Sequence, residues 1–314
     1  MGRKRKGRPI HGWLVIDKPS GMTSAAVVGK VRRLTGAARV GHAGTLDPMA
    51  TGVLPLAFGE ATKTVAYTMA ATKVYRFGLR WGERRDTDDA EGAITETSDV
   101  RPAEDAIVAA LDAFTGVIEQ VPPAYSAVKV DGRRAYDLAR ENRPVDLAPR
   151  RVVIHAFTYL GAPDADHAEF EVRCGKGTYM RSLARDLAAH LGTVGHVAWL
   201  RRLAVGPFAV EHAISLEKLA AFMHSAADFE GLLPVETALD DIPALALTGS
   251  EAGRLRCGQP VEVLRTADKT RVRELPDGTI LFAKEGDRPV ALAELVAHDS
   301  FEGWQIRPVR VLNL

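Results

Sequence analysis

The chain has 314 residues, a length that favours about two domains, because one hydrophobic core stops growing near ~250–300 residues. Hydrophobic residues make up 46% and charged residues 26% of the sequence, as in an ordinary soluble globular protein. No apolar run approaches the ~18–20 residues of a membrane helix, and no signal-peptide core is visible at the start. The two cysteines, Cys174 and Cys257, lack metal-type spacing and fit a reducing cytosol, so we expect a cytoplasmic location.

The formal net charge of +1 conceals a separation of charge along the chain. Residues 83–106 carry nine acidic and three basic side chains, whereas residues 171–202 carry six basic and two acidic ones. Such a protein can bind phosphates with one face while another face is acidic. Residues 1–11 contain the basic run RKRKGR and are expected to form a disordered arm, for which a solvated surface is the favoured interpretation.

The N-terminal three quarters of the chain alternate between predicted strands and helices. Apolar runs and alternation predict strands, whereas apolar residues at helical spacing predict helices. Strands are expected at 13–16, 53–58, 73–81, 151–160, 169–174 and 201–210. Helices are expected at 24–34, 60–70, 103–114 and 178–190, the last with Thr178 as its N-cap.

Two further segments complete the pattern. The acidic stretch 86–92 lacks the ligand spacing of a calcium loop and is interpreted as a solvated turn. Beyond a break around 225–245, short β-like runs alternate with glycine and aspartate turns and indicate a small β-rich module. These runs are 260–264, 279–283, 290–295 and 309–312.

One carboxylate, Asp47, lies in a loop punctuated by glycine and proline, GHAGTLDPMATGVLP at 41–55. Glycine permits close backbone approach and positive φ, and Pro48 biases Asp47 away from helical dihedrals. Local chemistry leaves two interpretations open, a turn-former or a nucleophile. The turn is favoured at this point, because Asp-Pro commonly begins turns.

Residues 121–151 form a basic segment with seven basic and four acidic side chains, among which Tyr125 and Tyr136 are interleaved. Aromatic rings among arginines suit stacking on RNA bases and pairing with phosphates. A surface hairpin and helix with ordinary solvated arginines fits the composition equally well.

The Asp47 loop resembles the catalytic motif of the TruB family of tRNA pseudouridine-55 synthases, whose pattern is close to G-x-x-G-x-L-D-P-x-A-x-G-x-L. The resemblance continues in family order over most of the chain. The further matching segments are 12–24, 59–63, 73–75, 120–127, 174–181, 195–196 and 200–202. Ala25 and Ala26 depart from the family, which usually has a polar pair ending in Asp there, so a contact at the start of that helix is expected to be missing.

The resemblance implies an α+β fold in three parts. Residues 12–240 would form the catalytic domain, a mixed and mainly antiparallel sheet with flanking helices. Residues 121–151 would be a thumb-like insertion that clamps the RNA. Residues 241–314 would form a small β-rich, PUA-like RNA-binding domain.

The resemblance also implies the roles of individual residues. Asp47 would be the catalytic carboxylate, Arg181 its charge partner, and Tyr75 the ring that stacks on the target base. Contacts with substrate are expected from His42, Lys63, Tyr179 and Leu200. From the residues alone, a solvated Arg181 and a core Tyr75 would be favoured. His196 is expected to be a hydrogen-bonded core histidine.

The implied reaction isomerises uridine to pseudouridine at position 55 in the T-loop of tRNA, with the base flipped out of the loop. It breaks the N1–C1′ bond and rejoins the uracil through C5, so nothing is oxidised or imported. We therefore expect no redox cofactor and no metal. We expect tRNA as the partner, no membrane and no obligatory protein partner, and a monomer. Whether Asp47 attacks C1′, attacks the uracil ring or assists deprotonation at C2′ stays open.

Two other function classes compete with this interpretation. A non-catalytic RNA-binding protein could use Asp47 as a turn residue, but it would need neither Tyr75 nor Arg181. A glycosidase-like hydrolase could use Asp47 as a nucleophile, but that class normally needs a second catalytic carboxylate, which no other motif supplies convincingly.

Overall fold

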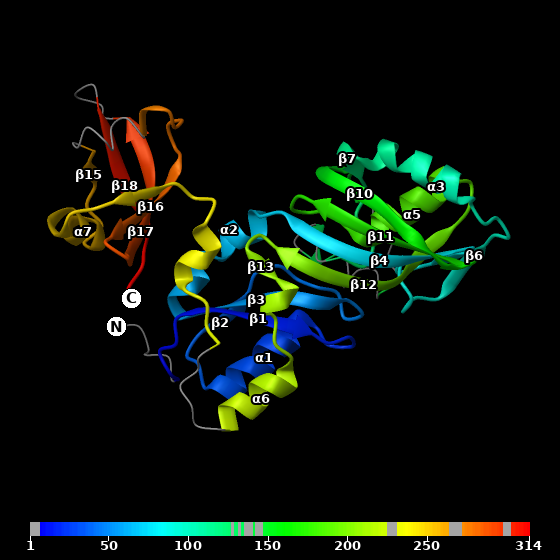
Figure 1. Ribbon diagram of the computed structural model, residues 1–314, viewed down its shortest axis with the longest axis horizontal. Coiled ribbons are helices and arrows are strands. Elements are labelled where there is room, and N and C mark those ends of the chain that lie inside the picture. Colours follow the sequence, from blue (N-terminus) through cyan, green and yellow to red (C-terminus); the bar gives the residue numbers. More distant parts are fainter. Residues whose placement is uncertain are drawn as a thin grey trace.

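The computed structural model describes residues 7–126, 129–130, 133–134, 141, 147–224, 231–263, 272–297 and 303–314. Figure 1 shows a large sheet flanked by helices and, at the opposite end of the molecule, a smaller sheet built by the last part of the chain. Within the described residues, no helix is both long enough and apolar enough to cross a bilayer.

The large sheet has nine strands in the described part of the chain. They are β1 (Gly12–Lys18), β2 (Val40–His42), β3 (Thr51–Phe58), β4 (Lys73–Trp81), β7 (Gly116–Gln120), β10 (Arg150–Asp164), β11 (His167–Cys174), β12 (Gly195–Val205) and β13 (Phe208–Ala209). The order is β1-β3-β12-β4-β11-β10-β7, with β2 on β3 and β13 on β12. Among these pairs β3 and β12 run parallel and the others antiparallel, which confirms the mixed, mainly antiparallel sheet.

The helices beside this sheet are α1 (Ser24–Thr35), α2 (Val65–Ala70), α3 (Glu104–Ala110), α5 (Met180–His190), α6 (Leu216–His224), and the 3₁₀ helices η1 (Gly59–Lys63), η2 (Leu111–Phe114), η3 (Val210–His212) and η4 (Val235–Leu239). The single helix expected at 60–70 is divided into η1 and α2. The hydroxyls of Thr62 and Thr64 donate to the carbonyls of Gly59 and Ala61, and such side-chain bonds compete with a regular helix. The helix expected at 103–114 is likewise divided, into α3 and η2.

The helix starts differ in part from expectation. The side chain of Thr23 accepts a hydrogen bond from the backbone N–H of Ala26 and caps α1. At α5 the expected N-cap, Thr178, is wrong: Tyr179 takes that position without a side-chain cap, because the Thr178 hydroxyl donates to the Gly175 carbonyl instead. The strand expected at 201–210 is also wrong in extent, because the chain turns at Gly206 between β12 and β13.

Two hairpins lie outside the large sheet: β5 (Glu83–Arg85) with β6 (Ile94–Thr97), and β8 (Lys129–Val130) with β9 (Arg133–Arg134). The second hairpin lies within residues 121–151, the expected thumb-like insertion. Tyr136 and most of residues 135–146 lie outside the described residues, as do residues 1–6. Residues 7–11, expected to belong to a disordered arm, are ordered. The backbone of Arg8 exchanges hydrogen bonds with Gly36 and Ala38.

The last part of the chain forms the small sheet, in the order β14-β16-β17-β18-β15. Its elements are β14 (Ala244–Ala246), α7 (Gly249–Arg256), β15 (Val261–Glu262), β16 (Ile280–Glu285), β17 (Arg288–Ala297) and β18 (Trp304–Val311). The β-rich C-terminal module is thus confirmed, although the sequence interpretation missed α7, which begins with a capping box of Thr248 and Glu251.

One of the three buried hydrophobic clusters in the described residues contains side chains from both sheets. Phe282, Leu292 and Leu312 of the small sheet pack in the same buried cluster as Trp13 and Phe208 of the large one. Removing the C-terminal module would therefore expose apolar surface on the large sheet. A truncated chain is not a clean test of what the small sheet contributes.

The parallel pair β3–β12 requires a glycine at position 52. Gly52 has a φ of +96°, and a Cβ built there would collide with the carbonyl group of Arg202 on β12. Gly21 also has a positive φ, +80°, but a Cβ there would meet nothing within 4 Å. An alanine at position 21 would therefore show backbone strain alone, whereas an alanine at position 52 would add a steric collision.

We predict that Gly52→Ala lowers the free energy of unfolding by about 3 kcal/mol or more, because it adds an overpacking penalty to the strain of a left-handed residue. Gly21→Ala should show the strain alone, about 1–2 kcal/mol. Urea unfolding of both variants measures the difference. Equal losses in the two variants would show that β3 and β12 can separate freely at this point.

Candidate active site

Asp47 and Arg181 meet in an ion pair, with Arg181 Nε 2.9 Å from Asp47 Oδ2. The N–H does not point along a hydrogen-bond direction, so Coulombic attraction carries the contact. The Arg181 side chain is only 4% exposed, whereas the Asp47 side chain is 34% exposed. The pair thus presents a carboxylate to solvent on a buried cationic support.

Two carbonyl acceptors and a nearby carboxylate fix the guanidinium of Arg181. Its Nη1 donates to the carbonyl of Thr87 and its Nη2 to the carbonyl of Tyr125, each at 2.9 Å. The carboxylate of Asp89 lies 3.6 Å from Nη1. Two separate loops, 86–92 and 121–126, therefore hold one side chain of α5, and the planar fork of arginine suits this arrangement.

The acidic stretch 86–92 is not the solvated turn expected from its composition. Asp88 and Asp89 are buried, and Asp88 has a φ of +58°, a left-handed conformation that Asp tolerates better than most residues. Arg185 Nη1 donates to Asp88 Oδ2 at 2.9 Å. Burial raises the pKa of Asp88, and the neighbouring Arg185 opposes that shift. Asp88 and Asp89 are buried because α5 supplies cations from about a hundred residues away in sequence.

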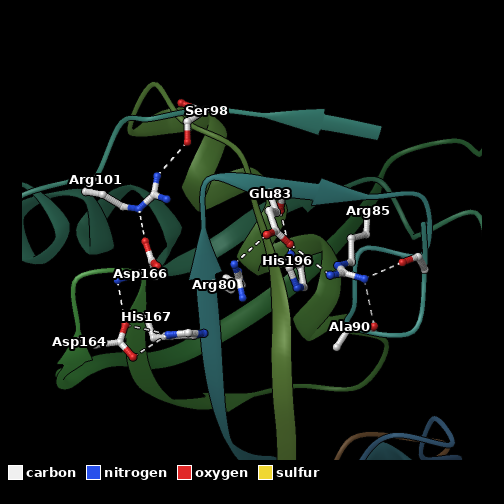
Figure 2. A network of polar contacts seen from close by, with 11 residues as sticks. Arg80, Glu83, Arg85, Ala90, Ser98, Arg101, Asp164, Asp166, His167 and His196 are labelled. Atoms are coloured by element: carbon white, nitrogen blue, oxygen red, sulfur yellow. Dashed lines mark hydrogen bonds and ion pairs between the residues drawn. The ribbon is translucent and has the colours of Figure 1, made fainter. Parts of the chain in front are cut away.

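The other side of this turn is held by the network in Figure 2. Arg85 Nη1 donates to the carbonyl of Gly92 at 2.8 Å and its Nη2 contacts Glu83 at 3.1 Å. His196 is buried, its Nδ1 lies 2.8 Å from the Glu83 carbonyl, and burial lowers its pKa. The expectation of a hydrogen-bonded core histidine is confirmed.

Lys18, at the end of β1, holds the Asp47 loop through hydrogen bonds from its ammonium group. Its side chain is fully buried, and Nζ donates to the carbonyls of Pro19, Met22 and Pro48 at 2.9, 2.6 and 3.0 Å. Burial lowers the pKa of Lys18 to about 8, and Asp47 opposes that shift. An ammonium group thus fixes the residue that follows Asp47.

The residue before Asp47 is fixed as well. Ser24, the first residue of α1, donates through Oγ to the Leu46 carbonyl at 3.1 Å and accepts from the Leu46 N–H at 2.9 Å. The sequence pattern assigned no role to Lys18 or Ser24. A lysine at the end of a mainly apolar strand was the available signal for Lys18.

Tyr75 on β4 faces Arg202 on β12 in the strand register, and Leu200 lies on the same face two residues away. Arg202 is buried and donates to the carbonyls of Val53 at 2.8 Å and Gly44 at 3.0 Å. Burial raises the pKa of Tyr75, while Arg202 opposes the shift and Asp47 adds slightly to it. The charges of Arg202 and Asp47 therefore both act on the Tyr75 hydroxyl.

Two of the other residues expected to contact substrate are His42 and Tyr179. His42, at the end of β2, has a buried Nδ1 without a hydrogen-bond partner among the described residues, and burial and then Arg202 lower its pKa. Tyr179 precedes Arg181 by two residues, and its backbone exchanges hydrogen bonds with the side chain of Gln120.

Lys63 lies elsewhere. Its Nζ contacts Glu60 Oε2 at 2.6 Å and donates to the carbonyl of Val311 on β18 at 2.7 Å. In this structure its ammonium therefore joins η1 to the small sheet.

Comparisons with known proteins agree along the whole chain. A family model described as TruB family pseudouridylate synthase (N terminal domain) matches residues 32–180, and one described as tRNA pseudouridylate synthase B C-terminal domain matches residues 181–240. A protein of Rhodospirillum rubrum named tRNA pseudouridine synthase B is 57% identical over 314 residues, covering 100% of both chains. The chain belongs to the TruB family of pseudouridylate synthases. A second TruB family relative with the same name, from Gluconacetobacter diazotrophicus, is 56% identical and covers 99% of this chain and 100% of its own.

Solved structures share the fold at lower identity. A chain of "Crystal Structure of a Cbf5-Nop10-Gar1 Complex" superposes with a TM-score of 0.74 at 24% identity, covering 96% of this chain and 85% of its own. A chain of "Structure of H/ACA RNP bound to a substrate RNA containing 2'-deoxyuridine" gives 0.73 at 23% identity, covering 100% and 92%. Both TruB family models end by residue 240, so the PUA-like nature of the small sheet stays a prediction.

We predict that Arg181→Lys lowers the single-turnover rate of pseudouridine formation by about 100-fold, which is about 2.7 kcal/mol. A lysine offers a point charge and cannot pair with Asp47 while also donating to the Thr87 and Tyr125 carbonyls. The matched control is Arg185→Lys, one turn further along α5, which should cost less because Arg185 pairs with Asp88. Equal rates for Arg181→Lys and the unaltered chain would contradict the role of the guanidinium fork.

Proposed function

We propose that this TruB family enzyme converts uridine to pseudouridine at position 55, in the T-loop of tRNA. The observation that carries the proposal is the partly exposed Asp47 carboxylate, paired with the buried Arg181. The names of relatives 50–57% identical over nearly the whole chain support tRNA as the substrate. The loop motif that carries Asp47 supports the T-loop position.

Asp47 acts on the nucleotide in this proposal. The N1–C1′ bond breaks, the uracil turns over, and a C5–C1′ bond forms, while the proton on C5 is lost and N1 gains one. A carboxylate can form a covalent glycosyl intermediate, attack the uracil ring or assist deprotonation at C2′. In each route Arg181 keeps the carboxylate oriented, because its own position is fixed by acceptors from two loops.

Tyr75 and Leu200 form the cradle for the detached base. The ring of Tyr75 stacks on the uracil, and Leu200, which is buried, supplies an apolar floor on the same face of the sheet. Because the pKa of Tyr75 is raised, its hydroxyl stays protonated at neutral pH and can donate a proton or a hydrogen bond.

The target uridine has to leave the folded T-loop to reach Asp47. Base flipping costs a few kcal/mol, which stacking and phosphate contacts offset. We assign those contacts to His42 and Tyr179 beside the site, to the basic insertion 121–151, and to Lys63 where η1 meets the small sheet.

The chain divides into a catalytic unit, residues 12–240, and a PUA-like RNA-binding module, residues 241–314. The end of the second family model at residue 240 supports this division. No obligatory partner and no second copy is needed, because one chain supplies Asp47, Tyr75 and Arg181. The free cysteines Cys174 and Cys257 support a reducing, cytoplasmic setting.

The proposal is tested by mapping the product. A tRNA transcript incubated with the chain should gain pseudouridine at position 55, and a transcript with cytidine at that position should gain none. Pseudouridine formed only at other positions, or in both transcripts alike, would refute the assignment of the T-loop uridine.

We predict that Asp47→Asn abolishes turnover and leaves RNA affinity within a few-fold of the unaltered chain. The change is nearly isosteric and removes only the charge and the nucleophile, whereas affinity depends on phosphate contacts and stacking. Single-turnover assays and filter binding measure the two quantities. Retained product formation would show that Asp47 is only a turn residue, and circular dichroism checks that the variant is folded.

We also predict that turnover on an isolated T-arm stem-loop survives exhaustive chelation. The isomerisation transfers no electrons and imports no group, so it needs no Lewis acid in principle. The stem-loop replaces whole tRNA because magnesium stabilises the folded tRNA. Activity that disappears with EDTA and returns with a transition metal would contradict the prediction.

A further inference from the structure

We propose that a second phosphate-binding surface lies at the C-terminal end of α1, about one helix length from Asp47, and contacts the tRNA backbone outside the T-arm. It is formed by four arginines, the α1 arginine cluster: Arg8, Arg32, Arg33 and Arg39. The proposal rests on the proposed function in taking tRNA as the substrate. It adds a surface that neither the family motif nor the catalytic site includes.

The sequence around α1 contains no acidic residue. From Lys18 to Leu46 there are five lysines and arginines and no aspartate or glutamate. This contrasts with residues 83–106, where Arg84, Arg85 and Arg101 all pair with carboxylates. No acidic residue close in the sequence therefore balances the positive charge of α1 and its flanking segments.

The four side chains are exposed and lack counter-ions in the described part of the chain. Arg8, Arg32, Arg33 and Arg39 are all exposed. Within the described residues, no carboxylate lies within the 4.0 Å ion-pair distance of any of the four guanidinium groups. Exposed guanidinium groups without counter-ions raise the local positive potential and attract anions.

Contacts bring Arg8 to the end of α1. The Arg8 N–H donates to the Gly36 carbonyl at 2.8 Å, and the Arg8 carbonyl accepts from Ala38 N–H at 2.9 Å. The aliphatic part of Arg8 covers Gly36, because a Cβ built on that glycine would lie 3.6 Å from Arg8 Cδ. Arg8 is thus packed beside the last turn of α1, which contains Arg32 and Arg33.

The helix dipole explains only two of the four arginines in the cluster. Basic side chains in the last turn of a helix are stabilised by the negative end of its dipole, which accounts for Arg32 and Arg33. Arg8 and Arg39 come from outside the helix and add two like charges at the same end. Like charges brought together without counter-ions oppose folding, and an anionic partner removes that repulsion.

The position of the cluster favours RNA as that partner. At its other end α1 is joined to the active-site loop through Ser24 and Leu46. The helix has 12 residues and is therefore about 18 Å long. Arg39 immediately precedes β2, which ends at His42. A substrate held at Asp47 that runs along α1 and extends beyond this distance would bring its phosphates to the cluster.

The test uses the full chain with Arg32→Gln and Arg33→Gln combined. Affinity is measured for whole tRNA and for the isolated T-arm stem-loop over a range of salt concentrations. We expect whole-tRNA affinity to fall about tenfold, and the slope of log K against log salt to become shallower by roughly 0.7–0.9 for each lost phosphate contact. Stem-loop affinity should change by less than about twofold, since this surface contacts phosphates outside the T-arm.

The matched control is Arg84→Gln with Arg101→Gln, which removes the same charge from the acidic stretch and should leave the salt slope unchanged. Arg39→Gln provides a second, independent variant, and melting curves confirm that each chain is folded. An unchanged slope on whole tRNA, or equal losses on whole tRNA and stem-loop, would overturn the proposal. So would lost binding to phosphatidylserine vesicles together with unchanged tRNA binding. Product mapping with the unaltered chain tests the proposed function separately.

Discussion

The guanidinium of Arg181 is the single group on which the geometry of the site depends. It lies on α5, faces the Asp47 carboxylate at 2.9 Å, and donates to the carbonyls of Thr87 and Tyr125. Because the acceptors come from the turn 86–92 and from the beginning of the insertion, three distant parts of the chain meet at one planar side chain. A shift in either loop would move the guanidinium, and with it the carboxylate. The pair of Asp88 and Arg185 secures the same turn one helical turn away.

The surroundings of Asp47 contain more buried positive charge than the carboxylate neutralises. Lys18, Arg181 and Arg202 are all buried, and Lys18 and Arg202 are held by backbone carbonyls. Burying a cation in this way is unfavourable, as the lowered pKa of Lys18 shows, so stability alone does not account for it. A site with excess positive charge attracts a polyanion such as RNA, and the α1 arginine cluster extends that charge beyond the catalytic loop.

Much of the fold could be predicted from sequence, because strands such as β4 and helices such as α1 have a clear apolar period. The site residues could be named only through the motif around Asp47, since local chemistry favoured a turn. The burial of Asp88 and Asp89 could not be predicted, because the arginines that pair with them lie almost a hundred residues further along the chain. Local composition describes the charge of a segment, whereas only tertiary contact decides whether that charge is solvated.

The most direct test of the central claim is a double-mutant cycle with Asp89→Asn and Arg181→Lys, measured as single-turnover pseudouridine formation at saturating RNA. If Asp89 acts by orienting the guanidinium, the two losses overlap, and the double variant is no slower than the slower single one. If the losses multiply fully, Asp89 and Arg181 act independently. The guanidinium would then not be the group through which the turn 86–92 positions Asp47.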